Sequence, residues 1–262
     1  MLCDFDGTLS PIVEDPARAE ALPGAVEVLH RLADRLDVVA VVSGRPADFL
    51  ASRLFELEQP TGPSASSATS LLRAFGLYGM EEVETAGSPG GLLDPALDGW
   101  RDAVEEAART IEPSMPAGTL VERKGLTLGL HWRHAPDEEA TVLALAAATA
   151  ARHGLTVRRG RMAAELVPPL PFDKGVVVGA LTAGLRAGCF CGDDLGDLPA
   201  FDALDRRAAT GDFLALKVAA ASPESPAELI ERADVVVEGP SGALELLRAL
   251  ERSVDPGRHG PG

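Results

Sequence analysis

The chain has 262 residues, 46% of them hydrophobic, and carries a formal net charge of −16. This length and composition suffice for a substantial buried core and exclude a wholly disordered protein. The acidic balance argues against nucleic acid as a partner, because phosphate backbones require clustered Lys and Arg. No apolar run approaches the roughly 20 residues that span a bilayer, no signal peptide is recognisable, and three cysteines fit a reducing compartment. We therefore expect a cytoplasmic, monomeric protein with neither a membrane nor a nucleic-acid partner.

Two apolar runs, 38–42 and 187–191, do not alternate with polar residues, which is typical of parallel strands buried on both faces. Helical patterns over residues 24–35, 176–187 and 241–252 alternate with such runs. This succession predicts an α/β fold with a doubly wound parallel sheet. In such sheets ligands bind beyond the carboxyl ends of the strands, so we expect Asp4, Ser43 and Asp193 to meet at one edge.

Between residues 88 and 171 the pattern changes. Helical stretches at 95–111 and 137–153 are each followed by two short strand-like segments, at 119–122 with 127–132 and at 156–159 with 163–167. This predicts a small α+β cap domain inserted into the core. We therefore assign residues 1–87 and 172–254 to the core, 88–171 to the cap and 255–262 to a disordered tail.

Asp4-Phe5-Asp6-Gly7-Thr8 places two carboxylates one residue apart, directly after a very short apolar run. Two acids at i and i+2 at a strand end can share a divalent cation and face one phosphate. One can attack phosphorus to form an aspartyl-phosphate, while the other protonates the leaving oxygen and then activates water. A solvated turn is the alternative for this motif alone, since Asp, Gly and Thr are ordinary turn residues.

Three further motifs follow at predicted strand ends or helix starts. Ser43-Gly44 offers a hydroxyl and helix-terminal amides to a phosphate, although such a serine is more commonly a plain N-cap. Lys174, before a helix, could neutralise a phosphoryl group, although most lysines are merely solvated. Asp193, Asp194 and Asp197 lie within five residues, and such carboxylates repel one another unless a cation holds them, which favours a Mg²⁺ site over a solvated acidic loop.

Together, in this order, these four motifs resemble those of the haloacid-dehalogenase (HAD) superfamily of phosphatases. The flanking segments are similar to the trehalose-6-phosphate phosphatase family over roughly residues 2–250. They are the opening run 4–13 with Asp15-Pro16, then Gly76–Glu81, Val121–Lys124, His131–Arg133, Gly160-Arg161 with Glu165, Phe172–Gly175, and Gly192–Asp194 with Ala200-Phe201. The resemblance implies a HAD-like core with a cap, and Mg²⁺-dependent hydrolysis of trehalose 6-phosphate to trehalose and phosphate.

The resemblance also implies roles for individual residues. Asp4 would be the nucleophile and Asp6 the general acid/base, while Ser43, Gly44 and Lys174 would bind the phosphoryl oxygens. Mg²⁺ would be held by Asp4, the backbone carbonyl of Asp6 and Asp193, with Asp194 and Asp197 completing or orienting that shell. The sugar-contacting positions would be Glu122, Lys124, Arg133, Arg161 and Glu165.

The sequence departs from the family pattern at three places. Only Met1–Cys3 precede Asp4, whereas a central strand has about five residues, so we expect a short first strand that upstream residues would stabilise. Gly196 replaces the usual Thr, which frees the backbone of the metal loop and is expected to weaken metal binding. Arg161 replaces the usual Lys, which is expected to shift sugar preference. The alternatives are a related phosphatase for another sugar phosphate and a degenerate domain that binds a sugar phosphate or a synthase without turnover.

Overall fold

The computed structural model describes residues 1–13, 15–55, 71–83, 95–160 and 162–254. Arg161 and the predicted tail at 255–262 lie outside these ranges. The chain separates into two compact units, Met1–Gly90 with Phe172–Gly262 and Gly91–Pro171. Sequence patterns placed the domain limits after residues 87 and 171. The two units are described in turn.

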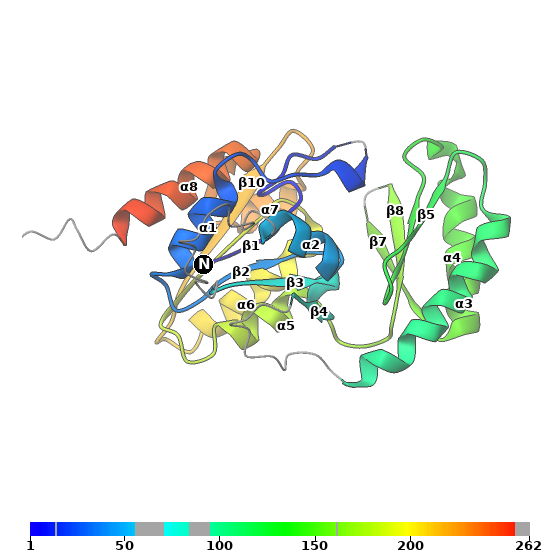
Figure 1. The fold of residues 1–262 in the computed structure, drawn as a ribbon, viewed down its shortest axis with the longest axis horizontal. Coiled ribbons are helices and arrows are strands. Elements are labelled where there is room, and N and C mark those ends of the chain that lie inside the picture. The colour runs from blue at the N-terminus through cyan, green and yellow to red at the C-terminus, as the bar shows by residue number, and fades with distance from the viewer. Residues whose placement is uncertain (14, 56–70, 84–94, 161, 255–262) are drawn as a thin grey trace, which may run out of the picture. The chain divides into compact units, whose positions relative to one another are not determined.

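The first unit is built on a seven-stranded sheet in the order β11-β10-β9-β1-β2-β3-β4 (Figure 1). Every neighbouring pair is parallel except β3 and β4, which run antiparallel. A parallel sheet requires crossover connections, and helices supply them on both faces, as the α/β prediction requires. The strands are β1 (Leu2–Cys3), β2 (Val39–Val42), β3 (Leu72–Gly76), β4 (Glu81–Glu82), β9 (Ala187–Gly192), β10 (Leu214–Ala221) and β11 (Val235–Glu238).

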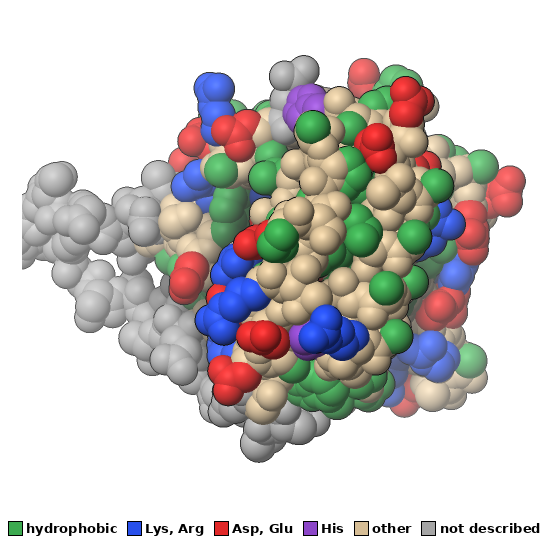
Figure 2. Space-filling view, turned by 90° about the vertical axis from the view of Figure 1, so that its right-hand side faces the viewer, with side chains coloured by type: hydrophobic (Ala, Val, Ile, Leu, Met, Phe, Trp, Pro, Cys, Tyr) green, Lys and Arg blue, Asp and Glu red, His purple; other side chains and the backbone are tan. Residues whose placement is uncertain are grey.

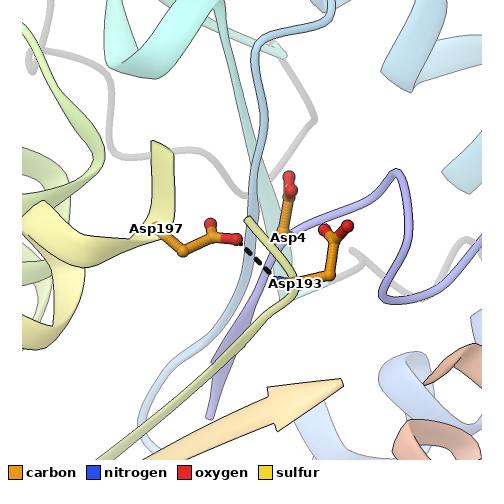
Figure 3. Close-up of side chains that lie close together, drawn as sticks. All are labelled: Asp4, Asp193 and Asp197. Atoms are coloured by element: carbon orange, nitrogen blue, oxygen red, sulfur yellow. Dashed lines mark hydrogen bonds between the residues drawn. The ribbon is translucent and has the colours of Figure 1, made fainter. Parts of the chain in front are cut away.

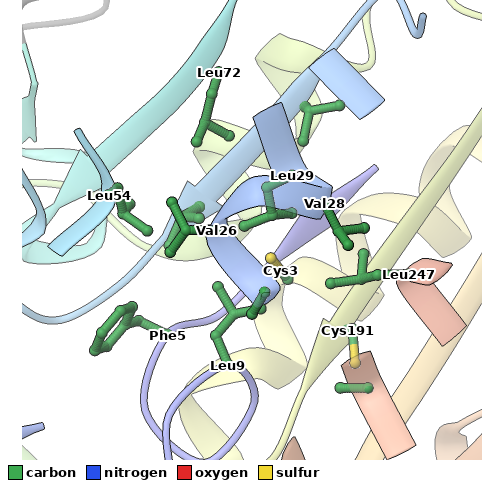
Figure 4. Close-up of a cluster of buried hydrophobic side chains, with 14 of the residues drawn as sticks. Cys3, Phe5, Leu9, Val26, Val28, Leu29, Leu54, Leu72, Cys191 and Leu247 are labelled. Atoms are coloured by element: carbon green, nitrogen blue, oxygen red, sulfur yellow. The ribbon is translucent and has the colours of Figure 1, made fainter. Parts of the chain in front are cut away.

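Six α-helices belong to the described part of this unit, and the larger ones cover the two faces of the sheet. Helices α1 and α8 pack on one face, where their apolar side chains form a buried cluster with β1, β2 and β10 (Figure 4). Helices α5 and α6 lie on the other face (Figure 1). The helices are α1 (Ala25–Ala33), α2 (Ala47–Leu54), α5 (Lys174–Leu181), α6 (Leu198–Ala208), α7 (Ala227–Arg232) and α8 (Gly239–Ser253), with 3₁₀ turns at Pro16–Arg18, Leu77–Gly79 and Leu195–Asp197.

The sequence prediction was wrong about the end of one helix. A helical pattern was expected to reach residue 187, but α5 ends at Leu181. The Thr182 hydroxyl donates to the carbonyl of Val178, 2.7 Å away, and Gly184 adopts a left-handed φ of 78°. Both features are typical of a helix C-terminus, so residues 182–186 form a turn that leads into β9.

The second unit has a four-stranded antiparallel sheet in the order β5-β6-β8-β7. Both expected strand pairs form, and β6 pairs with β8, so they become one sheet. Side chains of α3 and α4 pack with Leu128, Leu130 and Leu166 of the sheet. The elements are a 3₁₀ turn (Pro95–Trp100), α3 (Arg101–Ile111), β5 (Leu120–Arg123), β6 (Leu128–His131), α4 (Glu139–His153), β7 (Thr156–Gly160) and β8 (Ala163–Val167), with short 3₁₀ turns at Glu112–Ser114 and Pro136–Glu138.

Helix α4 consists largely of alanine, which favours helix but offers little side chain to solvent. Its inner residues Val142, Ala146 and Ala150 are buried, while Ala144 and Ala148 are exposed. Figure 2 looks onto the side of this unit that carries α3 and α4, and most charged side chains there lie towards the rim. Within the described ranges, no helix combines the length and apolar character needed to cross a bilayer.

Candidate active site

The carboxyl ends of three adjacent strands bring polar side chains together at one edge of the large sheet, as the sequence predicted. Asp4 follows β1, Ser43 follows β2 and Asp193 follows β9, and β1 lies between the other two strands. The Asp4 amide donates to the carbonyl of Cys191 at 2.9 Å, which ties the first motif to β9. Asp4 and Ser43 are buried, with exposed fractions of 6% and 1%.

Asp4, Asp193 and Asp197 form an acidic cluster in which one carboxylate oxygen from each lies within 4.8 Å of the others (Figure 3). Burial, followed by the charges of the neighbouring aspartates, raises the pKa of Asp193 to about 9. Burial likewise raises the pKa of Asp4 well above its usual value, although Lys174 acts in the opposite direction. Asp4 Oδ1 is buried and has no hydrogen-bond partner among the described residues.

These observations fit a divalent cation. Hard cations such as Mg²⁺ prefer carboxylate and carbonyl oxygens, and a cation would satisfy the unpartnered Asp4 oxygen while offsetting the repulsion among the acids. A Cβ atom on Gly7, whose φ is 71°, would overlap the Asp193 carboxylate. Gly7 therefore allows the turn after Asp6 to approach Asp193 closely.

Among the described residues, Lys174 supplies the positive charge that contacts the acidic cluster. Asp173 caps α5 by accepting from the Val176 amide at 2.9 Å, which makes Lys174 the first residue of the helix. The Lys174 ammonium lies 2.9 Å from Asp4 Oδ2 and 2.6 Å from Asp197 Oδ1. Burial alone would lower the pKa of Lys174, but the acids, Asp197 first, hold it well above its usual value. The ammonium therefore stays charged at neutral pH.

Asp197 and Asp194 organise the loop after β9. Asp197 is fully buried, and its Oδ2 accepts from the amides of Asp193 and Asp194 at 2.8 and 3.1 Å. Asp194 Oδ1 accepts from the Gly196 amide at 2.8 Å, which caps the short 3₁₀ turn. Asp194 is not in the acidic cluster, which Asp197 joins instead. A Cβ on Gly196 would lie 3.0 Å from Asp194 Oδ1, so a larger residue there would press on this cap.

Asp6 is held by a residue that sequence reasoning did not identify. Arg45 Nε and Nη2 donate to Asp6 Oδ2 and Oδ1, both at 2.7 Å, and this bidentate geometry fixes the plane of the carboxylate. The guanidinium also lies 4.6 Å from the centre of the Phe49 ring. The only signal in the sequence was the position of Arg45, two residues after a strand-end serine.

Ser43 and Gly44 lie at the expected sheet edge but do not begin a helix. Helix α2 starts at Ala47, and the Ala47 amide donates to Glu81 at 2.8 Å. The Ser43 hydroxyl accepts from the Arg45 amide at 3.2 Å. A Cβ on Gly44 would lie 2.8 Å from the Tyr78 hydroxyl, so glycine allows the ring to pack over this turn. Any phosphate cradle here would consist of the turn itself rather than the start of α2.

The structure groups three of the five predicted sugar-contacting residues in the second unit. Lys124 Nζ lies 3.1 Å from Glu165 and 3.7 Å from Glu122. Arg133 is exposed, and within the described part of the chain no hydrogen bond or ion pair joins it to this group. Arg161 lies outside the described residues. Two partners that were not predicted complete the group: the Thr127 hydroxyl donates to Glu165 at 2.8 Å, and His131 bonds to Glu122 at 2.9 Å.

Comparisons with known proteins point to one family. A family model described as trehalose-phosphatase matches residues 2–60. A trehalose-phosphate phosphatase of Mycobacterium tuberculosis is 34% identical over 208 residues, which are 76% of this chain and 49% of that protein. A second M. tuberculosis protein, described as an uncharacterized glycosyl hydrolase, is 34% identical over 77% of this chain and 15% of its own length. The chain thus spans about half or less of these curated relatives.

Solved structures share the fold. The C-terminal domain of trehalose-6-phosphate phosphatase from C. albicans has a TM-score of 0.71 at 22% identity, covering 96% of this chain and 91% of that one. A haloacid dehalogenase-like hydrolase from Bacteroides thetaiotaomicron has a TM-score of 0.58 at 15% identity, covering 95% and 98%. At these identities the likeness concerns the fold, which is HAD-like. Over about three quarters of its length the chain is similar in sequence to trehalose-phosphate phosphatases, and its residues 2–60 match the trehalose-phosphatase family model.

Proposed function

We propose that this protein hydrolyses trehalose 6-phosphate to trehalose and phosphate through an aspartyl-phosphate on Asp4. The observation that carries the proposal is the buried nucleophile itself. Asp4 is fixed by Lys174 at 2.9 Å, has one oxygen without a partner among the described residues, and lies in the acidic cluster. A buried carboxylate with this set of neighbours is unusual unless it performs chemistry.

In the first half of the reaction, an oxygen of Asp4 bonds to phosphorus while the bond from phosphorus to the sugar oxygen breaks. A sugar alkoxide is a poor leaving group, so a protonated Asp6 would donate its proton to that oxygen. Lys174 and the turn at Ser43-Gly44 would bind the phosphoryl oxygens and stabilise charge in the transition state.

In the second half, water attacks the phosphorus of the aspartyl-phosphate and the Asp6 carboxylate takes the proton of that water. Phosphate leaves and Asp4 is regenerated. When Asp6 is ionised, the two hydrogen bonds from Arg45 would hold it in one orientation, ready to accept the proton of the water. Asp4, Asp193 and the backbone carbonyl of Asp6 would hold Mg²⁺, with Asp194 and Asp197 orienting them, and the bound ion supplies positive charge to the phosphoryl group.

The sugar would be selected by the second unit, through Glu122, Lys124 and Glu165 together with Arg133 and Arg161. Carboxylates accept hydrogen bonds from sugar hydroxyls and cationic side chains donate to them, so a mixed set suits a hydroxyl-rich ligand.

Phosphate release tests the proposal. The purified chain should release phosphate from trehalose 6-phosphate when Mg²⁺ is present, and EDTA should abolish the release. Asp4→Asn should abolish turnover because an amide cannot accept the phosphoryl group, and Asp6→Asn should lower it steeply. A parallel panel with sucrose and mannosylglycerate phosphates separates this substrate from the related alternatives. Faster turnover of another panel member would reassign the substrate, and no turnover of any member would favour a binding domain.

A further inference from the structure

The polar cluster of the second unit lies on one face of its sheet. Glu122 pairs with Gly129 on β6, and Gly129 pairs with Glu165 on β8, so the two carboxylates flank a glycine in one cross-strand row. Thr127 and His131 share this face with Gly129, because alternate residues of a strand point the same way. Leu128 and Leu130 point to the opposite face, where they pack with the helices. The sheet thus separates an apolar face from a polar one.

Lys124 and one other described side chain approach each carboxylate of the row. Lys124 Nζ lies between them, 3.1 Å from Glu165 Oε1 and 3.7 Å from Glu122 Oε2. Thr127 donates to the same oxygen of Glu165 at 2.8 Å. His131 Nε2 lies 2.9 Å from the same oxygen of Glu122. These donors converge on Oε2 of Glu122 and on Oε1 of Glu165, so one oxygen of each carboxylate is held in place by hydrogen bonds within the unit.

Gly129 keeps the space between the two carboxylates open. A Cβ atom at this position would lie 3.0 Å from His131 Nε2 and 3.3 Å from Glu122 Oε2, which is tighter than about nine in ten Cβ contacts, so the neighbouring side chains would have to shift. The backbone of Gly129 is not in the left-handed region, so conformational freedom does not explain the glycine. What the missing side chain provides is room beside the His131–Glu122 bond.

We propose that His131 is a positioning residue, and Gly129 a specificity-determining residue, for the neutral, hydroxyl-rich part of the substrate. The inference rests on the proposed sugar-phosphate function. His131 holds Glu122 so that the carboxylate accepts a hydroxyl without first losing rotamer freedom, and Gly129 leaves the space in which the sugar approaches the row. The ligand that fits this face is a sugar whose hydroxyls reach the carboxylates of Glu122 and Glu165. These carboxylates lie on the strands to either side of Gly129.

Steady-state kinetics on two substrates test the inference. Trehalose 6-phosphate needs the sugar-binding face, whereas p-nitrophenyl phosphate carries no sugar. His131→Ala should raise KM for trehalose 6-phosphate about 10-fold, the equivalent of one oriented hydrogen bond, with kcat changed less than about 3-fold. The ratio of kcat/KM for the sugar phosphate to that for p-nitrophenyl phosphate should fall by a similar factor. His131→Gln, which retains a nitrogen donor, should recover part of that ratio.

The glycine is tested in the same way. Gly129→Ala should lower the ratio about as much as His131→Ala, because the added methyl group presses on the His131–Glu122 bond. His134→Ala and Gly99→Ala are matched controls in the same unit: His134 is exposed, and a Cβ on Gly99 would meet no atom within 4 Å. Neither control should change the ratio.

The outcomes separate this inference from the function on which it rests. If the protein hydrolyses trehalose 6-phosphate but His131→Ala and Gly129→Ala leave the ratio unchanged, the inference is wrong and the proposed function stands. Equal losses on both substrates would show a merely structural role and would also overturn it. If trehalose 6-phosphate is not hydrolysed, the same ratios measured on the preferred sugar phosphate decide the inference, and activity on p-nitrophenyl phosphate alone refutes both proposals.

Discussion

Replacing Lys174 by methionine should destabilise the protein far more than the same replacement of Lys217. Both lysines contact two aspartates. The Lys174 side chain is 3% exposed and its partners are 8% and 0% exposed, at 2.9 and 2.6 Å. The Lys217 side chain is 15% exposed, but Asp205 and Asp234 are 44% and 45% exposed, at 2.7 and 3.9 Å. Comparing the two variants therefore isolates the effect of burial, because both lysines form similar ion pairs with two aspartates.

Removing one partner of a buried ion pair costs about 3–5 kcal/mol, because a carboxylate remains in a poorly solvated site without its cation. We expect about 3 kcal/mol for Lys174→Met, the lower end of that range, for two reasons. Asp4 can take up a proton, and Asp197 keeps two backbone donors. Solvent screens the Lys217 pairs, so Lys217→Met should cost about 0–1 kcal/mol.

Urea unfolding followed by circular dichroism, at pH 7.5 in EDTA, measures both free energies of unfolding directly. The loss from Lys174→Met should shrink at pH 5.5, since protonated carboxyls no longer require the ammonium. The loss from Lys217→Met should change little over this interval. Equal losses in the two variants, or a loss below about 1 kcal/mol for Lys174→Met, would refute the reasoning that Lys174 compensates buried charge.

Three further outcomes follow from the same structure. Because the folded pKa of Asp193 is raised from 3.8 to about 9, stability in EDTA should fall as pH rises through that interval. Mg²⁺ should therefore raise the melting temperature more at pH 8 than at pH 5.5, and an equal gain at both would contradict this. Arg45→Ala should lower kcat/KM for trehalose 6-phosphate roughly 10–100-fold, because Asp6 would no longer be held in one orientation. The loss should be smaller for p-nitrophenyl phosphate, whose leaving group needs no general acid. Equal losses on the two substrates would mean that Arg45 acts on the phosphate instead. Adding three β-branched residues before Met1 should raise the melting temperature by roughly 2–4 °C if the longer strand contributes about 1 kcal/mol. The reason is that β9 begins at Ala187, whereas Leu2 of β1 pairs with Phe190, so the first residues of β9 have no partner in β1. A cavity of about 410 Å³ lies beside Met1 and Ala187. An unchanged melting temperature would count against a longer first strand.

The parallel sheet and the strand ends that carry Asp4, Ser43 and Asp193 were predictable because they depend on local pattern. Uninterrupted apolar runs indicate buried parallel strands, and parallel strands must present their carboxyl ends at one edge. This was enough to bring Asp4, Ser43 and Asp193 together. Helix ends were less certain, because a run such as 176–187 stays apolar through the turn and into the next strand. The end of α5 depends on Thr182 bonding back to its own helix and on Gly184, which the apolar pattern does not register.

Side-chain pairings at the site were not predictable from the sequence. Arg45 reaches Asp6 across 39 positions, and Lys174 reaches Asp4 across the sheet edge. Such contacts depend on the direction of long, flexible side chains once the strands have assembled, and no spacing rule encodes that. The hydrogen-bond partners of Glu122 and Glu165 were missed for the same reason. Thr127 and His131 become neighbours of Glu165 and Glu122 only through the register of β5, β6 and β8.

The charges at the acidic cluster suggest an order of binding. Asp6 and Arg45 neutralise each other, so they add no net charge to the site. The three carboxylates of the cluster share only the Lys174 ammonium, which leaves two negative charges when all are ionised. A phosphate ester brings further negative charge into a protein that is already at −16, so it would be repelled from this arrangement. In the absence of a cation, Asp4 and Asp193 retain protons because their pKa values are raised, and a divalent cation would release those protons as it offsets the two charges of the ionised cluster. Metal binding should therefore precede substrate binding.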